Sequence, residues 1–227
     1  MIWEALERVK TLKFKVNGWE AVGDMEGDTA TYRAVFGRIH YKDSSRDYYL
    51  KPGELKQIAK LDWAPPGLTE YLEACNGVLA LGKELDTDAL IHEDGRHLAH
   101  VLAEAGEARL VGILGKRASG WASKCPGGAY ATHYAAMSCR PDMVDEVVKR
   151  CPKGVTDKVD KNGWAAIHYL AKAGGPPSMA KAVDLYGTGP KAKTRKDNGE
   201  IPKGSTAIEI AEHFGHRELA AAMKALK

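Results

Sequence analysis

The chain lacks the features that mark a secreted or membrane-spanning protein. Its 227 residues contain only four cysteines, none of them paired in a CxxC spacing. No run of about 18 apolar residues is present, which is the length a membrane-spanning helix requires. The first ten residues mix charged with apolar side chains, unlike a signal peptide. We therefore expect a cytoplasmic protein with reduced thiols and no membrane association, because disulfides mainly stabilise small secreted domains.

An excess of one charge is also missing. The chain carries 33 Lys and Arg against 30 Asp and Glu, so its net charge is only +3. This balance disfavours a strongly basic nucleic-acid binder. A hydrophobic content of 44% and a charged content of 28% are those of an ordinary folded protein. The length allows one extended domain or two small ones.

No catalytic signature occurs in the chain. The GxSxG, P-loop, GxGxxG and HExxH patterns are all absent. The remaining candidates are scattered, such as His40 and the run from His92 to Asp94, which leads into a turn. We therefore expect no enzymatic activity, no catalytic residues, no metal site and no cofactor.

The first third of the chain predicts a mixed α/β segment over residues 1–50 and a helical pair over 51–87. Apolar residues at helical spacing predict a helix over 2–12, and β-branched and aromatic residues predict strands over 14–22, 31–41 and 47–50. Helices over 51–61 and 68–81 follow, the first with a proline at its start. The basic and aromatic side chains of the strands are typical of half-buried strands, although they would also suit base stacking.

A repeated pattern fills the rest of the chain. Turn glycines stand at positions 95, 128, 163 and 204, spaced 33, 35 and 41 residues apart. Each begins a short helical pattern that leads to a second one. Three units have a histidine five residues after the glycine, at His100, His133 and His168, whereas the fourth has Glu209. A glycine separates the two helices at positions 106, 174 and 215, and Cys139 stands in its place in the second unit.

This pattern resembles the ankyrin repeat, whose period is about 33 and whose motif is Gly-x-Thr-Pro-Leu-His-x-Ala. The match is partial, because only Thr206 keeps the motif threonine and no unit keeps the proline. The resemblance implies a mainly α protein with a small β-containing N-terminal part (α+β). Its repeats would form a solenoid of about four helix pairs over 88–227, near 92–124, 125–159, 160–190 and 200–227. The pair at 51–87 is open to interpretation as a degenerate capping repeat.

The resemblance also assigns roles to the motif residues. The turn glycines are expected where φ is positive. The three motif histidines are expected to tie neighbouring turns together by hydrogen bonds, as scaffold residues rather than metal ligands or bases. Acidic residues at Asp94, Asp160 and Asp197 precede three of the turns and are expected to serve the backbone. Small residues are expected to let adjacent helix pairs approach, namely Ala99, Ala135, Ala166, Ala171 and Ala211.

Proteins of this family bind other proteins through the hairpin tips and inner helices. The resemblance therefore implies a protein-interaction module whose partner is another protein, and by family association an effector or inhibitor of a host protein. Aromatic and basic residues are frequent interface anchors. The candidate partner-binding residues are Arg96, Trp121, Tyr130, Tyr134, Trp164, Tyr169, Lys191, Lys193, Arg195 and Lys196.

Two questions remain open in the sequence. The insertion over 187–202, which holds the last four of these residues, is either a solvated, flexible loop or a contact for an acidic surface or phosphate. Tyr134 and Tyr169 are either exposed or packed between repeats. The alternative function is a nucleic-acid-associated protein that uses the N-terminal strands and the basic loop at 191–196.

Overall fold

The computed structural model describes residues 1–16, 19–25, 28–35, 38–41, 47–49, 56, 59–60, 66–84, 91–175, 179–180 and 188–226. These residues are mainly helical, which confirms the predicted helical class. The chain divides into two compact units, Met1–Lys83 and Glu84–Lys227. Residues 85–90, which include the predicted boundary at 87, lie outside the described part.

The first unit begins with helix α1 (Ile2–Val16). The helix buries a stripe of apolar residues at Ile2, Leu6, Val9 and Leu12, spaced three or four apart as in a one-sided helix. The predicted end at residue 12 and the predicted strand start at 14 are wrong, because residues 14–16 continue the helix. Lysines at positions 13 and 15 lie in its last turn, where cations interact favourably with the helix dipole.

The backbone after α1 forms four antiparallel strands in the order β1-β2-β3-β4. They are β1 (Trp19–Met25), β2 (Asp28–Val35), β3 (Arg38–Tyr41) and β4 (Asp47–Tyr49). Each strand pairs with the next along the chain, with Trp19 opposite Ala34 in the first pair. The side chains of these strands lie outside the described part. The nucleic-acid alternative rests partly on those side chains.

Helix α3 (Leu68–Glu84) completes the first unit. It buries Leu68, Tyr71, Cys75 and Val78 on one face. The helix predicted over 68–81 is therefore confirmed, with three further residues at its end. The helix predicted over 51–61 lies mostly outside the described residues.

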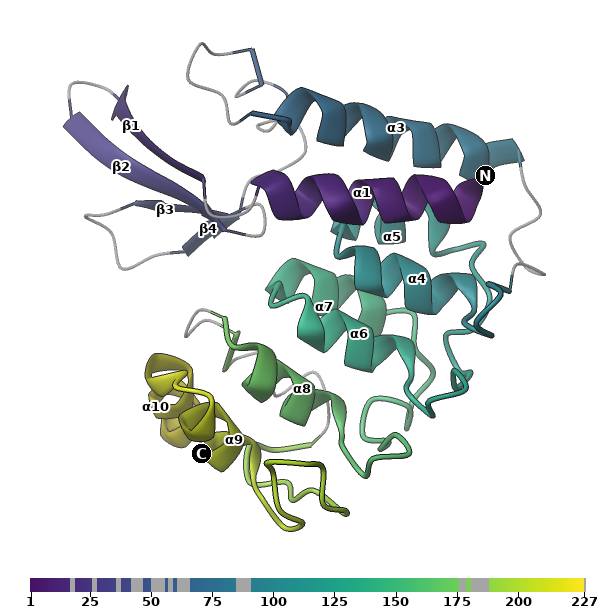
Figure 1. Ribbon diagram of the computed structural model, residues 1–227, viewed down its shortest axis with the longest axis vertical. Coiled ribbons are helices and arrows are strands. Elements are labelled where there is room, and N and C mark those ends of the chain that lie inside the picture. The colour runs from purple at the N-terminus through teal and green to yellow at the C-terminus, as the bar shows by residue number, and fades with distance from the viewer. Residues whose placement is uncertain are drawn as a thin grey trace. The chain divides into compact units, whose positions relative to one another are not determined.

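The second unit is a series of short helices. They are α4 (Leu98–Ala105), α5 (Ala108–Leu114), α6 (Ala131–Met137), α7 (Pro141–Val148), α8 (Ala166–Ala173), α9 (Ala207–His213) and α10 (Arg217–Ala225). Helix α4 contacts α6, α6 contacts α8, and α8 contacts α9. Helices α5, α7 and α10 each contact the helix before them in the chain, and α5 also contacts α7. Figure 1 shows α4, α6, α8 and α9 following one another through this unit. The second helix predicted after α8, over 179–185, lies mostly outside the described residues.

Small residues permit this close succession of helices. The five alanines predicted at the helix contacts are all fully buried. Larger apolar side chains fill the space between the pairs, including Leu102, Leu110, Met143, Ile167 and Leu170, each at most 1% exposed. Burying a side chain of this kind stabilises the fold by about 1.5–3 kcal/mol.

Candidate partner-binding surface

Each of the helices α4, α6, α8 and α9 is preceded by a turn with a glycine in the left-handed region. The φ angle is +80° at Gly95, +79° at Gly128, +75° at Gly163 and +90° at Gly204. A side chain at such an angle is strained, whereas glycine is not. The predicted need for glycine at these four positions is confirmed. We call the segments 91–97, 124–130, 158–165 and 193–206 together the turn row.

Successive turns of the row lie against each other at these glycines. A Cβ atom added to Gly95 would stand 2.7 Å from Pro126 Cγ of the next turn. One added to Gly128 would stand 2.8 Å from the backbone nitrogen of Lys161. At Gly204, where no described turn follows, nothing lies within 4 Å. Glycine is therefore required twice over inside the row, for its φ and for the approach of the next turn.

Hydrogen bonds join the later turns directly. Lys161 N donates to Gly127 O at 3.3 Å, and Arg195 N donates to Gly163 O at 2.9 Å. The Lys196 ammonium donates to the Lys161 carbonyl at 2.9 Å. The turns at 124–130, 158–165 and 193–206 thus form one continuous edge of the second unit.

A buried histidine reinforces each step of this edge. His133 accepts a hydrogen bond at Nδ1 from the Tyr130 N–H (3.1 Å), at the start of α6. Its Nε2 lies 3.1 Å from the Trp164 carbonyl in the next turn. Because Nδ1 is the acceptor, the proton of the neutral ring sits on Nε2 and is donated to that carbonyl. One ring therefore caps a helix and binds the following turn.

The same arrangement occurs before and after His133. His100 accepts from the backbone N–H that precedes α4 (3.1 Å) and contacts the Ser123 carbonyl at 3.0 Å. His168 accepts from the N–H that precedes α8 (2.9 Å) and contacts the Ala192 carbonyl at 3.0 Å. The predicted role of the three histidines in tying neighbouring turns is confirmed.

Burial keeps these rings neutral. Burial lowers the pKa of His100 to about 4, despite the hydrogen bond to Ser123 that favours the charged form. Burial likewise lowers the pKa values of His133 and His168. Protonation at Nδ1 would also displace the backbone N–H that it accepts. Both ring nitrogens are therefore committed to the backbone.

In the fourth repeat, a carboxylate stands in place of the motif histidine. The Thr206 hydroxyl accepts from Glu209 N at 3.2 Å, and Glu209 Oε2 accepts from Thr206 N at 2.7 Å. This reciprocal capping box satisfies two N–H groups at the start of α9. It holds the helix without reaching a further turn, which suits the last unit of the series.

The acidic residues before the turns serve the backbone, as predicted. Asp160 Oδ1 accepts from the backbone N–H groups of Asn162 and Trp164, each at 2.9 Å. Asp94 Oδ1 accepts from the N–H two residues later at 3.0 Å. Asp197 Oδ1 accepts from Lys203 N at 2.7 Å, across a longer turn. These carboxylates shape the turns.

Arg96 and Tyr134 lie together at the first turns. The Arg96 guanidinium forms ion pairs with Asp94 (2.7 Å) and Glu104, and its carbon Cζ lies 5.8 Å from the centre of the Tyr134 ring. Burial opposes its charge, but the hydrogen bonds and charges of Glu104 and Asp94 together outweigh this and raise the pKa of Arg96. Tyr134 is half-buried and its hydroxyl lies 3.5 Å from Cys125 Sγ. Both side chains reach the surface with their polar groups already engaged.

Two candidate residues are buried. Trp164 is 1% exposed, and Tyr130 is 7% exposed and stacks on the ring of His133. The Trp164 ring lies against the rings of His168 and Tyr169, so both candidates are packed within the fold and neither presents a surface to a partner. We therefore remove both from the candidate surface. The aromatic signal in the sequence did not distinguish these packing rings from contact rings.

Trp121 and Tyr169 are half-buried. The Trp121 indole N–H donates to the Gly115 carbonyl at 2.9 Å. The Tyr169 hydroxyl donates to Asp160 Oδ2 at 2.6 Å, and its ring meets that of His133 edge-on. Burial raises the pKa of Tyr169 to about 12. The sequence left open whether Tyr134 and Tyr169 are exposed or packed between repeats. In the structure both rings are packed on one side and partly exposed.

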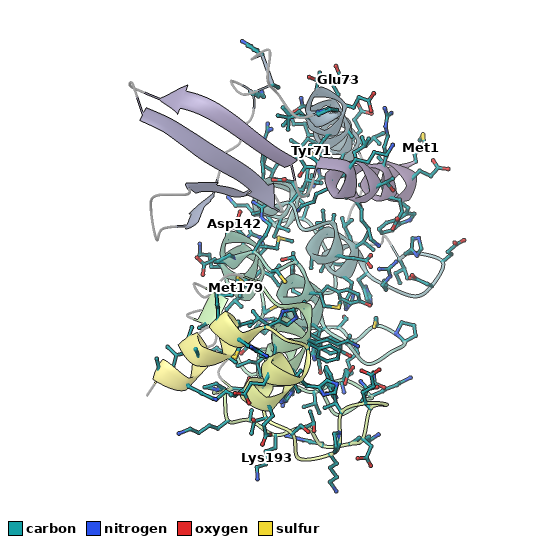
Figure 2. All side chains as sticks on the ribbon, turned by 60° about the vertical axis from the view of Figure 1, so that its left-hand side comes forward. Met1, Tyr71, Glu73, Asp142, Met179 and Lys193 are labelled. Atoms are coloured by element: carbon teal, nitrogen blue, oxygen red, sulfur yellow. The ribbon has the colours of Figure 1, made fainter. Side chains whose placement is uncertain are left out.

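The basic insertion contains an ordered, hydrogen-bonded hairpin. Thr194 is 3% exposed, and its hydroxyl accepts from Gly204 N (3.0 Å) and Ser205 N (3.2 Å) and donates to Pro202 O (3.0 Å). Lys191, Lys193, Arg195 and Lys196 are all exposed around it. Figure 2 shows Lys193 on this loop, at the edge of the second unit. Sequence reasoning missed Thr194, since a threonine among lysines gives no periodic signal.

The described residues show neither a metal-binding cluster nor a membrane-spanning helix. No group of three His, Cys, Asp or Glu side chains in the described part has the arrangement of a metal site. Within the same residues, no helix is long and apolar enough to cross a bilayer. The arrangement instead offers a continuous edge of turns and the adjacent first helices.

No protein-family model matches this chain, and no curated protein matches it.

Proposed function

We propose that the chain is a protein-interaction module in which residues 88–227 form an array of about four ankyrin-type helix pairs. The observation that carries this proposal is the periodic histidine arrangement. His100, His133 and His168 each cap one helix and bind the carbonyl of the next turn, 33 and 35 residues apart. The first three turn glycines, Gly95, Gly128 and Gly163, have the same spacings, and the fourth follows after 41 residues. Such an array presents an extended surface suited to recognition.

The proposed binding face consists of the turn row and the exposed residues of the first helices. Met137 on α6 is 39% exposed, and Lys172 on α8 and Glu212 on α9 are also exposed. Tyr134 and Tyr169 contribute partly exposed rings beside them. The chain would act by binding a partner, as an effector or inhibitor, in the cytoplasm. Rigid aromatic and basic anchors of this kind dominate many protein interfaces.

An affinity-capture experiment tests this proposal. The full chain is immobilised, and proteins retained from an extract of its source cells are compared with those retained by two variants. Met137→Glu/Lys172→Glu alters the first helices. Ile113→Glu/Lys116→Glu applies the same change in charge beside α5, at exposed positions. We expect the first variant to lose a specifically retained protein and the second to keep it.

The alternative outcomes are clear. If no protein is retained above a blank column, or if the two variants retain the same protein equally, the binding face is not where we propose. If the retained material is nucleic acid, the proposed class of partner is wrong. Circular dichroism of both variants controls for folding.

A further inference from the structure

The turn row is basic from its second segment onward, whereas its first segment, 91–97, holds two carboxylates against one arginine. Its last three segments, 124–130, 158–165 and 193–206, hold seven Lys and Arg against three carboxylates. Their net charge of +4 therefore exceeds the +3 of the whole chain. All seven cations are exposed, whereas the carboxylate of Asp160 is buried by its hydrogen bonds. The edge thus exposes seven cations against two carboxylates, Asp197 and Glu200.

One of the seven cations interacts with a described carboxylate: the pKa of Glu209 is lowered by its hydrogen bonds to Thr206 and, to a smaller extent, by the charge of Lys193. Lys124, Lys161, Arg195 and Lys196 form no ion pair with any described carboxylate. On the helices, by contrast, Arg150 pairs with Glu146 at 2.8 Å, and Lys149 and Lys224 are also paired. Unpaired cations also occur singly elsewhere, such as Arg217 on α10, whereas the turn row groups several of them along one edge.

The structure also holds these cations in place. The side chain of Lys161 lies over Gly128, and that of Arg195 over Gly163. The Lys124 ammonium lies 5.6 Å from the centre of the Tyr130 ring, within cation–π range. Fixing long side chains before binding reduces the entropy lost when a partner arrives. The row is therefore a positive edge in which Lys124 and the stems of Lys161 and Arg195 are partly restrained.

We propose that the turn row binds an acidic segment of a partner protein, with Lys124, Lys161, Arg195 and Lys196 facing successive Asp or Glu side chains. This inference rests on the proposed function and names the chemistry of the partner. A single-stranded nucleic acid fits less well. Its binding sites combine cations with exposed aromatic rings for stacking, whereas Tyr130 and Trp164 are buried in the row. Complementary charge would set the rate and the specificity of the encounter.

Fluorescence anisotropy with a defined probe tests the inference. The probe is a fluorescein-labelled Glu-rich peptide of about 20 residues, titrated with the full chain at low salt, where exposed charges are least screened. The test variant is Lys161→Glu/Arg195→Glu. The matched control is Lys15→Glu/Arg217→Glu, two exposed positions outside the row, so both variants change the net charge from +3 to −1.

We expect the test variant to weaken peptide binding about 10-fold or more and the control less than about 3-fold, since exposed pairs contribute modestly one by one. Lys161→Gln/Arg195→Gln should fall between wild type and the test variant, which separates lost attraction from added repulsion. Equal loss in both Glu variants, or no binding of the peptide, overturns the inference. Tighter, row-dependent binding of an oligonucleotide of equal charge overturns the choice of partner.

These outcomes are independent of the capture experiment. Specific capture that depends on Met137 and Lys172, without row-dependent peptide binding, leaves the interaction module in place and rejects its acidic partner. Failure of both experiments rejects both proposals.

Discussion

Replacing His133 by alanine is the most direct test of the hydrogen-bond arrangement between the turns. The ring is fully buried, accepts from Tyr130 N and contacts the Trp164 carbonyl. Two hydrogen bonds contribute about 1 kcal/mol each, and a buried N–H left without an acceptor costs about 1–3 kcal/mol. Removing a ring from a packed site adds a cavity, and such truncations cost about 3–5 kcal/mol in total. We expect a loss of about that size.

The prediction has two companion variants. His133→Gln can still reach back to the Tyr130 N–H, as Glu209 does at the equivalent position with Thr206. It cannot also hold the Trp164 carbonyl, so we expect roughly half of the loss of the alanine variant. His213→Ala removes an exposed ring on α9 and should change stability by less than about 0.5 kcal/mol.

Urea unfolding at pH 7.5, followed by circular dichroism, gives the free energy of unfolding for each variant. Calorimetry should show His133→Ala melting roughly 6–20 °C lower, since 1 kcal/mol shifts a domain of this size by about 2–4 °C. A loss below about 1 kcal/mol, or equal losses for His133→Ala and His213→Ala, refutes the reasoning. In that case the two hydrogen bonds and the packed ring would not support the stack.

Three further predictions follow from the same contacts. Stability should fall as the pH is lowered from 6.5 to 5. Burial lowers the folded pKa of His100 to about 4, so in this window protons bind that ring mainly in the unfolded chain, and burial shifts the pKa values of His133 and His168 in the same direction. A ring of this kind removes at most about 1.4 kcal/mol per pH unit, and a flat urea midpoint between pH 6.5 and 5 contradicts this. Gly163→Ala should lower the free energy of unfolding by about 3 kcal/mol and Gly204→Ala by about 1 kcal/mol. Only at Gly163 would the new Cβ atom meet a backbone nitrogen, at 2.9 Å. Equal urea midpoints for the two variants would exclude this close contact. Thr194→Val should speed amide hydrogen exchange at Gly204 and Ser205, because it removes the acceptor of their N–H groups. The global free energy of unfolding should change by no more than about 1 kcal/mol. Unchanged exchange rates would mean that the hydroxyl does not order the hairpin.

Local features of the second unit could be predicted because short segments determine them. A glycine at positive φ and a histidine three residues into a helix are set by the backbone of their own turn. The period of about 33 then indicates which turns are neighbours. Gly128 and His133 therefore have the conformation and the hydrogen bonds that the sequence indicates.

Burial of individual rings could not be predicted in this way. Four aromatic residues have similar sequence surroundings, since each lies beside a turn or a motif histidine; they are Tyr130, Trp164, Tyr134 and Tyr169. The structure buries the first two and leaves the others partly exposed. The difference depends on how each ring packs in three dimensions, which the order of residues along a turn does not specify. The period indicates which repeat is the neighbour, but it does not indicate how deeply a given side chain is buried against that repeat.

Cys139 shows how a departure from the pattern can keep its geometry. Cys139 stands where the three other repeats have glycine. Its φ of +54° is the only positive value of a non-glycine residue in the described part. Its thiol donates to the Gly174 carbonyl at 2.9 Å, in the next unit. The strain of a side chain at this angle, about 1–3 kcal/mol, is thus offset by a buried contact between units. The sequence alone showed only the mismatch.

The two kinds of side chain in the turn row have separate tasks, and this separation bears on how the surface would change during evolution. The glycines allow the turns to adopt positive φ angles, and the histidines and aspartates accept hydrogen bonds from the backbone. Replacing any of them therefore weakens the turns or the connection between them. The seven cations are all exposed, and although Lys196 donates to the Lys161 carbonyl, substitutions of most exposed residues change stability by less than about 0.5 kcal/mol. Their clustering is therefore not required by the fold. The same turns could present another charge pattern, which is why charge-reversal variants of the row can test the proposed binding without unfolding the chain.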